Sequence, residues 1–162
     1  MWLSDRRVFL TGLASALAAC GFQPVYGPEG GGNRLLNRVT VKAPETRETY
    51  LFTRRFEERL GRGGAGGYGL SVNITTNQKD LGSISSGEIT RYRINGTASF
   101  VLSDANGTPI ITDKTRAFTG YSTTGSTVAT LSAERDAVER LMVILADQVI
   151  DALLLASDTL PE

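Results

Sequence analysis

The sequence predicts an α+β fold: a two-layer sandwich in which two helices pack on one face of a four-stranded, mostly antiparallel sheet. Three observations lead to this prediction. Apolar residues recur at steps of three or four in two segments, and they alternate with polar residues in four others. These segments follow one another as strand, helix, three strands and helix. Short turn sequences join consecutive strands, which implies antiparallel neighbours.

The first strand and the first helix are predicted near the start of this domain. In the segment 36–43, Val39 and Val41 alternate with polar residues, and Pro44 ends the strand. The segment 47–60 is predicted as a helix that stops at Gly61. Its apolar stripe recurs every four residues: Phe52, Phe56 and Leu60.

A glycine-rich stretch follows this helix. Residues 61–66 match the spacing G-x-G-x-x-G of a loop that binds dinucleotide phosphates. Such a loop must follow a strand and open a helix, whose N-terminus holds the phosphate. Here a helix precedes the stretch and a strand follows it, so a flexible connector is the favoured interpretation.

The next two strands are predicted at 70–75 and 89–103, and the polar segment Gln78–Glu88 between them is predicted as a loop. One side of the later strand carries its larger apolar residues: Tyr92, Ile94, Ala98, Phe100 and Leu102. The fourth strand is predicted at 110–121. Asn106-Gly107 favours the tight turn before it, although Asn95-Gly96 is an alternative turn sequence.

The last predicted element is a long amphipathic helix at 132–157. Its expected inner stripe follows steps of three and four: Ala133, Ala137, Leu141, Ile144, Leu145, Gln148, Ala152 and Leu155. Leu153-Leu154-Leu155 is expected to pack on the sheet, and a surface for a partner is the alternative.

The N-terminus has the parts of a secretory signal peptide. Arg6 and Arg7 precede the apolar segment Val8–Ala19, which is too short to span a bilayer comfortably. Leu17-Ala18-Ala19-Cys20 then resembles the lipobox of bacterial lipoproteins, in which the cysteine is acylated and the chain is cut before it. The two arginines fit a twin-arginine export signal or an ordinary signal peptide.

These features divide the chain into four parts. We expect a signal peptide at 1–19, an acylated N-terminus with a flexible, glycine-rich tether at 20–33, a folded domain at 34–158 and a short tail at 159–162. Gly21 after the cysteine fits transit to the outer membrane, because an aspartate there often retains lipoproteins at the inner membrane. We therefore expect a lipid-anchored protein on the periplasmic face of the outer membrane.

Composition argues against an enzyme. The chain contains no histidine and one cysteine, so the commonest general base, the commonest metal ligand and any internal disulfide are missing. No metal and no cofactor are expected other than the covalent lipid on Cys20. The net charge is zero, and bulk electrostatics therefore do not favour nucleic acid as a partner.

One basic cluster is a candidate binding site. Arg91 and Arg93 lie on the third predicted strand, and Lys114 and Arg116 lie on the fourth. Folding at the Asn106-Gly107 turn would bring the two strands side by side, with like charges opposed. The cluster could bind phosphates or acidic sugars, or it could serve only solubility. Whether both pairs point to the same face depends on the register of the fourth strand, which the sequence leaves open.

Several segments resemble the alphaproteobacterial branch of the LptE family of lipopolysaccharide-assembly lipoproteins. The most specific segments are the mature start CGFQPVYG and the final helix, and the sheet is matched more loosely: residues 20–27, 91–94, 96–98, 121–122, 133–137 and 145–149. The resemblance implies a palmitate-type lipid anchor on Cys20 and a position inside the β-barrel of LptD. It also implies contact with lipopolysaccharide and help in barrel assembly. An auxiliary or structural envelope lipoprotein of another lipid-transport system is the alternative.

Overall fold

The computed structural model describes residues 27, 30–64, 67–83, 89–123 and 126–160. The chain divides into two compact units, Met1–Asn33 and Arg34–Glu162. The predicted signal segment and Cys20 lie outside the described residues. In the first unit, the side-chain amide of Asn33 donates to the carbonyl oxygen of Gly27 at 2.5 Å, and a single 3₁₀ turn, η1 (Gly31–Arg34), leads into the second unit.

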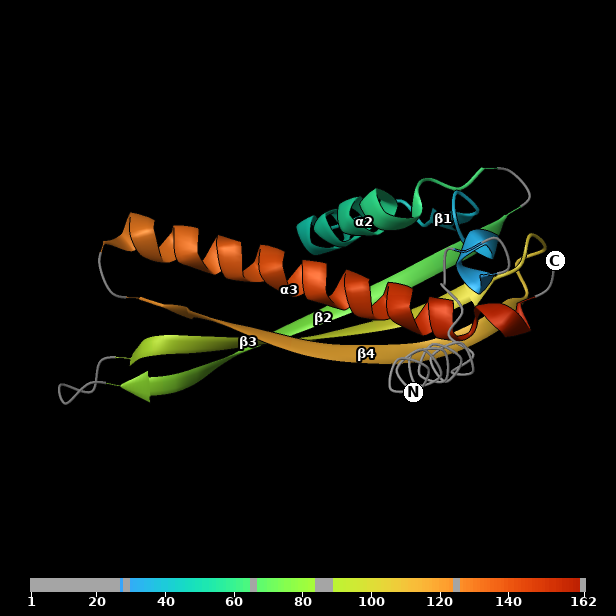
Figure 1. The fold of residues 1–162 in the computed structure, drawn as a ribbon. Helices are drawn as coiled ribbons and strands as arrows, with labels where there is room; N and C mark the ends of the chain where they lie inside the picture. The colour runs from blue at the N-terminus through green and yellow to red at the C-terminus, as the bar shows by residue number, and fades with distance from the viewer. Residues whose placement is uncertain (1–26, 28–29, 65–66, 84–88, 124–125, 161–162) are drawn as a thin grey trace, which may run out of the picture. The chain divides into compact units, whose positions relative to one another are not determined.

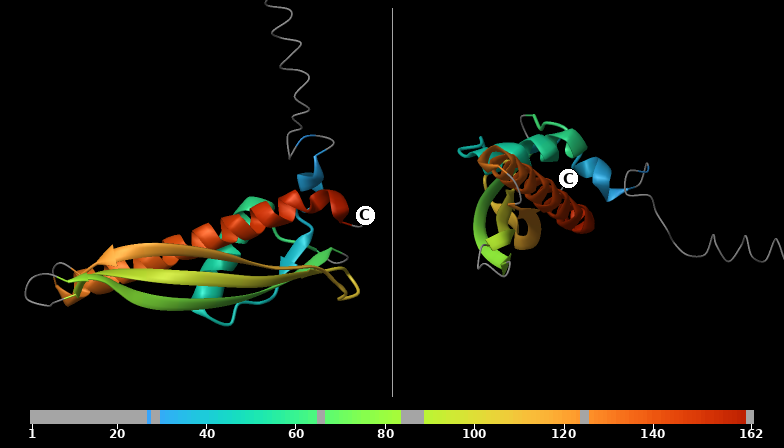
Figure 2. Two further views of the ribbon diagram at one scale, coloured as in Figure 1. Left: turned by 90° about the horizontal axis from the view of Figure 1, so that it is seen from below. Right: turned by 90° about the vertical axis from the view of Figure 1, so that its left-hand side faces the viewer.

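The second unit has the predicted α+β architecture (Figure 1). Its sheet has the order β1-β2-β3-β4, with β1 parallel to β2 and the other neighbours antiparallel. The two helices pack against each other and on one face of the sheet (Figure 2). The elements are β1 (Val39–Val41), α2 (Arg47–Leu60), β2 (Tyr68–Ser83), β3 (Ile89–Ser103), β4 (Pro109–Ser122), α3 (Thr127–Leu155) and η2 (Ser157–Thr159).

Helix α2 has the predicted bounds because its ends are capped locally. The hydroxyl of Thr46 accepts the backbone N–H of Thr49, and the hydroxyl of Thr49 accepts the N–H of Thr46, which together form a capping box. Gly61 ends the helix with φ +74°, a conformation that side chains disfavour, and its N–H donates to the carbonyl of Glu57. The glycines after α2 thus connect it to β2, as the order of elements predicted.

Strand β2 is longer than predicted. The segment Gln78–Glu88 was expected to be a loop, yet β2 continues to Ser83, with Lys79 opposite Arg93 and Asp80 opposite Tyr92. The register then shifts between Asp80 and Gly82, where β2 bulges. The prediction was wrong here because this part of β2 has one large apolar side chain, Leu81, and that side chain is exposed. This part of the strand therefore lacks the apolar alternation by which strands are recognised.

Helix α3 begins at Thr127, earlier than predicted, where the Ser126 hydroxyl accepts the N–H of Ala129. The predicted inner stripe was partly wrong, since Ile144 is 38% and Leu155 is 87% exposed to solvent. Because α3 contacts α2 as well as β3 and β4, it needs a wide apolar arc rather than one narrow stripe. The residues it buries are Ala137, Leu141, Met142, Leu145, Ala146, Val149, Ile150 and Leu153.

Strand β3 forms the centre of the core. Its predicted inner residues Ile94, Ala98, Phe100 and Leu102 are buried beneath the helices. Asn95 and Gly96 lie within this strand, so that alternative turn is ruled out. The turn follows at Asn106-Gly107, where the carboxylate of Asp104 accepts two backbone N–H groups and Gly107 has φ +83°.

Candidate functional site

The helices cover only one face of the sheet. In paired strands, directly opposed residues share a face, so the register assigns each side chain to one side. Even-numbered residues of β3 from Ile94 to Leu102 face the helices, and odd-numbered ones face away from them. The left view of Figure 2 shows the three long strands in front of both helices. We call this helix-free side the uncovered face.

All four predicted basic residues lie on the uncovered face. Arg116 is opposite Thr97 and Lys114 is opposite Ser99, which places both on the same side as Arg91 and Arg93. The register thereby settles the orientation that the sequence left open. The expected opposition of like charges between β3 and β4 is wrong, however, because Arg91 faces Ser122 and Arg93 faces Gly120. The two pairs are staggered along the sheet instead.

A fifth cation joins this row from β2. Lys79 lies directly opposite Arg93 on the uncovered face. Sequence reasoning missed it because it assigned Lys79 to a loop. Eight residue steps along β3 separate the level of Arg91 from that of Lys114, which corresponds to about 27 Å at roughly 3.4 Å per residue. The cations therefore form an extended row across three strands, and we call these five residues the cation row.

The uncovered face has no acidic counterpart for this row. At its regularly paired positions in β2, β3 and β4, up to the bulge, the described strands carry no aspartate or glutamate. None of the five cations forms an ion pair within the part of the chain that the structure describes. Most other side chains here are serine, threonine or asparagine. A nearly neutral protein thus gathers positive charge on one side of one sheet.

An exposed aromatic side chain lies within the cation row. Phe118 of β4 is 59% exposed, and the guanidinium carbon of Arg93 lies 3.6 Å from the centre of its ring. The Nε of Arg93 is buried and has no hydrogen-bond partner among the described residues. Gly120, opposite Arg93, carries no side chain that could cover the guanidinium. The face therefore combines an exposed aromatic ring with a guanidinium that is stacked on one side of it.

A shallow hollow of about 330 Å³ continues this face beyond Lys114. Its lining includes Ser71, Asn73, Ser99 and Thr112, whose side chains offer hydroxyl and amide groups. Lys114 is paired with Ser99 at its border. The lining of the hollow also includes Val72, Phe100, Val101 and the acidic Asp113, so the hollow by itself does not favour an anionic ligand.

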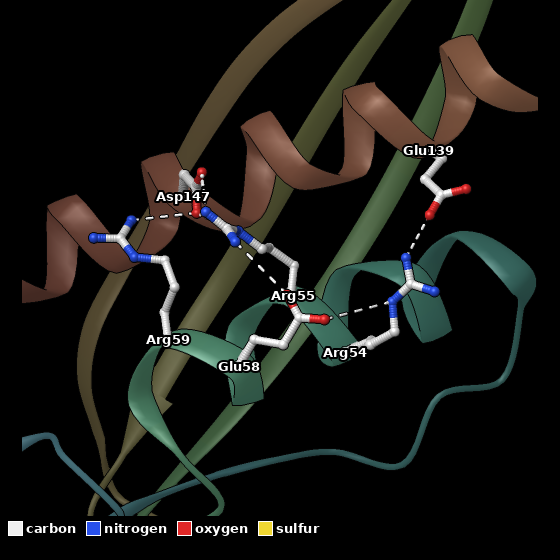
Figure 3. Close-up of polar contacts among 6 residues, drawn as sticks. All are labelled: Arg54, Arg55, Glu58, Arg59, Glu139 and Asp147. Atoms are coloured by element: carbon white, nitrogen blue, oxygen red, sulfur yellow. Dashed lines mark hydrogen bonds and ion pairs between the residues drawn. The ribbon is translucent and has the colours of Figure 1, made fainter.

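The arginines on the helix side have a different environment (Figure 3). Arg55 donates from Nε and Nη2 to the two carboxylate oxygens of Asp147 at 2.9 and 3.1 Å, and Arg59 adds a third contact at 3.2 Å. Partial burial acts to raise the pKa of Asp147, but the hydrogen bonds from the two arginines outweigh it and lower the pKa. Arg54 also pairs with Glu139, so acidic residues of α3 neutralise α2.

Two other classes of site are not found in the described residues. They contain no group of three or more histidine, cysteine, aspartate or glutamate side chains that could hold a metal ion. No helix among them is both long enough and apolar enough to cross a membrane.

Solved structures share this fold. A candidate lipoprotein from Caulobacter crescentus CB15 superposes with a TM-score of 0.64 at 19% identity, over 79% of this chain and 96% of that one. The rare lipoprotein B from Shewanella oneidensis gives 0.57 at 11% identity, over 75% and 95%. The minor lipoprotein from Acinetobacter baumannii gives 0.54 at 18% identity, over 78% and 96%. At these identities the likeness shows the fold alone.

The family assignment comes from a second comparison. No curated protein matches the chain. The family model LptE, described as lipopolysaccharide-assembly, matches residues 36–153, which include both helices and all four strands except the last residues of α3. With this match over most of its length, the chain belongs to the LptE family of lipopolysaccharide-assembly proteins.

Proposed function

We propose that this protein is an outer-membrane lipoprotein that plugs the β-barrel of LptD, assists its assembly and helps deliver lipopolysaccharide to the outer leaflet. Acyl chains on Cys20 would hold it at the periplasmic face of the membrane. Family membership supports the role in lipopolysaccharide assembly. The observation that carries the proposal further is the uncovered face, with its unpaired cations and no acidic residue at its regularly paired positions.

The polar character of this face supports a place inside a barrel. The lumen of an outer-membrane barrel is polar and the lipid-facing side is apolar. Serine, threonine and asparagine side chains on the uncovered face can hydrogen-bond to water or to such a lumen without burying apolar surface. The helix-covered face, in contrast, already buries its apolar residues within this domain.

The cation row supports direct contact with lipopolysaccharide. We propose that Arg91, Arg93, Lys114 and Arg116 include the residues that contact the phosphates of lipid A or the acidic inner core. Arginine offers a planar fork that matches phosphate oxygens, and lysine acts as a point charge. The roughly 27 Å length of the row suits a ligand with several separated anionic groups better than one phosphate. This role is binding, and it requires no catalytic group.

The partnership with the barrel can be tested by isolating the protein from outer membranes. We expect a complex of about one to one with a large barrel protein, and depletion of this protein should lower the amount of correctly assembled barrel. Unchanged barrel levels and assembly after depletion would contradict the plug. They would favour instead an auxiliary lipoprotein of another lipid-transport system.

The anchor has its own test. The intact mass of the membrane-extracted protein should show a chain that starts at Cys20 and carries acyl chains. Cys20→Ala should leave the chain unacylated and uncut at that site. A mature chain that begins at Cys20 without lipid mass would contradict this part of the proposal.

A further inference from the structure

We infer that the uncovered face carries a subsite for one sugar ring that bears a phosphate or carboxylate group. In this subsite the sugar ring stacks on the side of Phe118 that Arg93 leaves open, and Arg116 binds its anionic group. The inference rests on the proposed function, since it names the part of lipopolysaccharide that this region would recognise. It adds a ring-recognising element to what would otherwise be a purely electrostatic surface.

The exposure of Phe118 is the first argument. A phenylalanine normally buries most of its surface, yet this one is 59% exposed on a strand face whose neighbours are polar or charged. Arg93 covers one side of the ring, which leaves its other side and its edges for a ligand. The C–H groups of a sugar ring carry partial positive charge and are attracted to the negative face of an aromatic ring.

The arrangement of charge around Phe118 is the second argument. Arg116 lies two residues away on the same strand and the same face, about 7 Å along β4. Arg93 approaches from β3 and covers the opposite side of the ring. A ligand on the open side of the ring would therefore lie between Phe118 and the guanidinium of Arg116, which forms no ion pair among the described residues. An anionic substituent would gain charge-assisted hydrogen bonds from Arg116 and a longer-range attraction to Arg93.

Two amide side chains complete the subsite. Asn95 lies directly opposite Phe118 on β3, and Asn77 lies opposite Asn95 on β2. The amide of Asn95 makes only a long contact of 3.5 Å to the backbone oxygen of Asn77. Both amides can thus serve sugar hydroxyls as donors and acceptors. A free phosphate ion would make no use of the ring, and a neutral sugar would leave Arg116 without an anion.

The test uses the full-length acylated protein in detergent micelles and three probes without acyl chains. These are glucosamine 1-phosphate, inorganic phosphate and unphosphorylated glucosamine, each titrated while amide signals of β3 and β4 are followed by NMR. We expect the sugar phosphate to bind more tightly than either of the other two. Equal affinity for the sugar phosphate and inorganic phosphate would overturn the subsite.

Variants of Phe118 test whether the aromatic ring causes the preference for the sugar phosphate. Phe118→Leu should weaken sugar-phosphate binding by about three- to tenfold and leave inorganic phosphate unaffected, while Phe118→Tyr should retain binding. The matched control is Tyr50→Leu, because Tyr50 is 56% exposed on α2, and it should change nothing. If Phe118→Leu leaves sugar-phosphate binding unchanged, or weakens only the association with the barrel, the subsite is wrong.

The two proposals can fail separately. If charge reversal at Arg91 and Lys114 abolishes lipopolysaccharide binding while Phe118→Leu has no effect on the sugar phosphate, the proposed function stands and the subsite is overturned. If sugar-phosphate binding depends on Phe118 but intact lipopolysaccharide does not bind and no barrel co-purifies, the subsite stands. The ligand is then a free sugar phosphate, and the proposed function is contradicted.

Discussion

The two faces of the sheet use the same kinds of residue in opposite ways. The helix-covered face is apolar, and Arg54, Arg55 and Arg59 on α2 are paired with acidic residues of both helices. The uncovered face is polar, and its five cations have no acidic partner in the described chain. Positive charge is thus paired between the two helices and left unpaired, among the described residues, on the face of the sheet that the helices do not cover.

This difference has an energetic side. Lys79 and Arg93 are like charges directly opposed across β2 and β3, an arrangement that costs stability by some tenths of a kcal/mol up to about 1 kcal/mol. The contacts of Asp147 with Arg55 and Arg59 act in the opposite direction. The proposed anion binding would offset the cost of the first arrangement.

The largest expected effect on stability comes from comparing two neighbouring residues of β3 that lie on opposite faces of the sheet. Phe100 is buried under the helices and its neighbour Ser99 lies on the uncovered face. Phe100→Ala should lower the free energy of unfolding by about 3–5 kcal/mol, because it removes buried area and leaves a cavity. Ser99→Ala should stay within about 0.5 kcal/mol. Urea unfolding measures both variants. Equal losses in the free energy of unfolding would contradict the assignment of Phe100 and Ser99 to different faces.

A smaller effect is expected where the sheet touches α3. A Cβ atom on Gly96 would lie 3.0 Å from side-chain carbons of both Leu141 and Leu145, so glycine allows this close approach. Gly96→Val should destabilise the protein by about 1–3 kcal/mol through overpacking. Thr97→Val, on the uncovered face of the same strand, is the control and should cost little. Comparable unfolding midpoints for the two variants would contradict the packing.

The ion pairs of Asp147 with Arg55 and Arg59 should contribute about 1 kcal/mol to the free energy of unfolding. Asp147→Asn removes the carboxylate that holds Arg55 and Arg59, and its partial exposure limits the loss. Because the folded-state pKa of Asp147 is lowered, its contribution is complete above the unfolded-state value near 4 and is lost as the pH falls through the folded-state value. The difference between wild type and variant should therefore shrink from pH 7 to pH 3.

A matched control for this pair is Asp151→Asn. Asp151 is more exposed and lies 3.7 Å from Arg59, so its loss should cost only a few tenths of a kcal/mol. Urea unfolding at several pH values measures both variants. A difference for Asp147→Asn that stays constant down to pH 3 would contradict the lowered pKa.

The smallest effect should have the opposite sign. Lys79→Ser removes the like charge opposite Arg93 and should stabilise the fold by a few tenths of a kcal/mol, most clearly at low salt. Lys42→Ser is the comparison, because Lys42 pairs with Glu45 at 2.9 Å and its loss should give no gain. Thermal unfolding at two salt concentrations distinguishes them. A loss of stability in Lys79→Ser would show that the pair is not repulsive.

Most of the fold could be predicted from the sequence because its elements follow local rules. Helix α2 and strand β3 have strong periodicity and clear ends, and both were predicted with the observed bounds. The far part of β2 was missed because its pairing with β3, rather than its own pattern, makes it a strand. The inner stripe of α3 was only partly predicted because α2 and the sheet both cover that helix.

The candidate site could be predicted only in part for a related reason. Spacing along each strand placed Arg91 with Arg93 and Lys114 with Arg116. The face shared by the two pairs depends on the register of β4, a tertiary property. Lys79 pairs with Arg93 across β2 and β3, and Arg93 contacts Phe118 across β3 and β4. Both neighbours depend on strand pairing and are therefore not visible in the spacing along one strand. Sequence reasoning would have found Lys79 only by extending the pairing of β2 beyond its apolar part.

The most direct test compares charge reversal on the two sides of the molecule. Arg91→Glu with Lys114→Glu changes the uncovered face, and Arg54→Glu with Arg62→Glu makes the same change in net charge among the paired arginines of the helix side. We expect the first double variant to lower lipopolysaccharide affinity at least tenfold and to keep the barrel complex, while the affinity of the second stays within about twofold of wild type. Equal losses in both variants would assign binding to bulk charge, and unchanged binding in the first at low and high salt would contradict the role of the uncovered face.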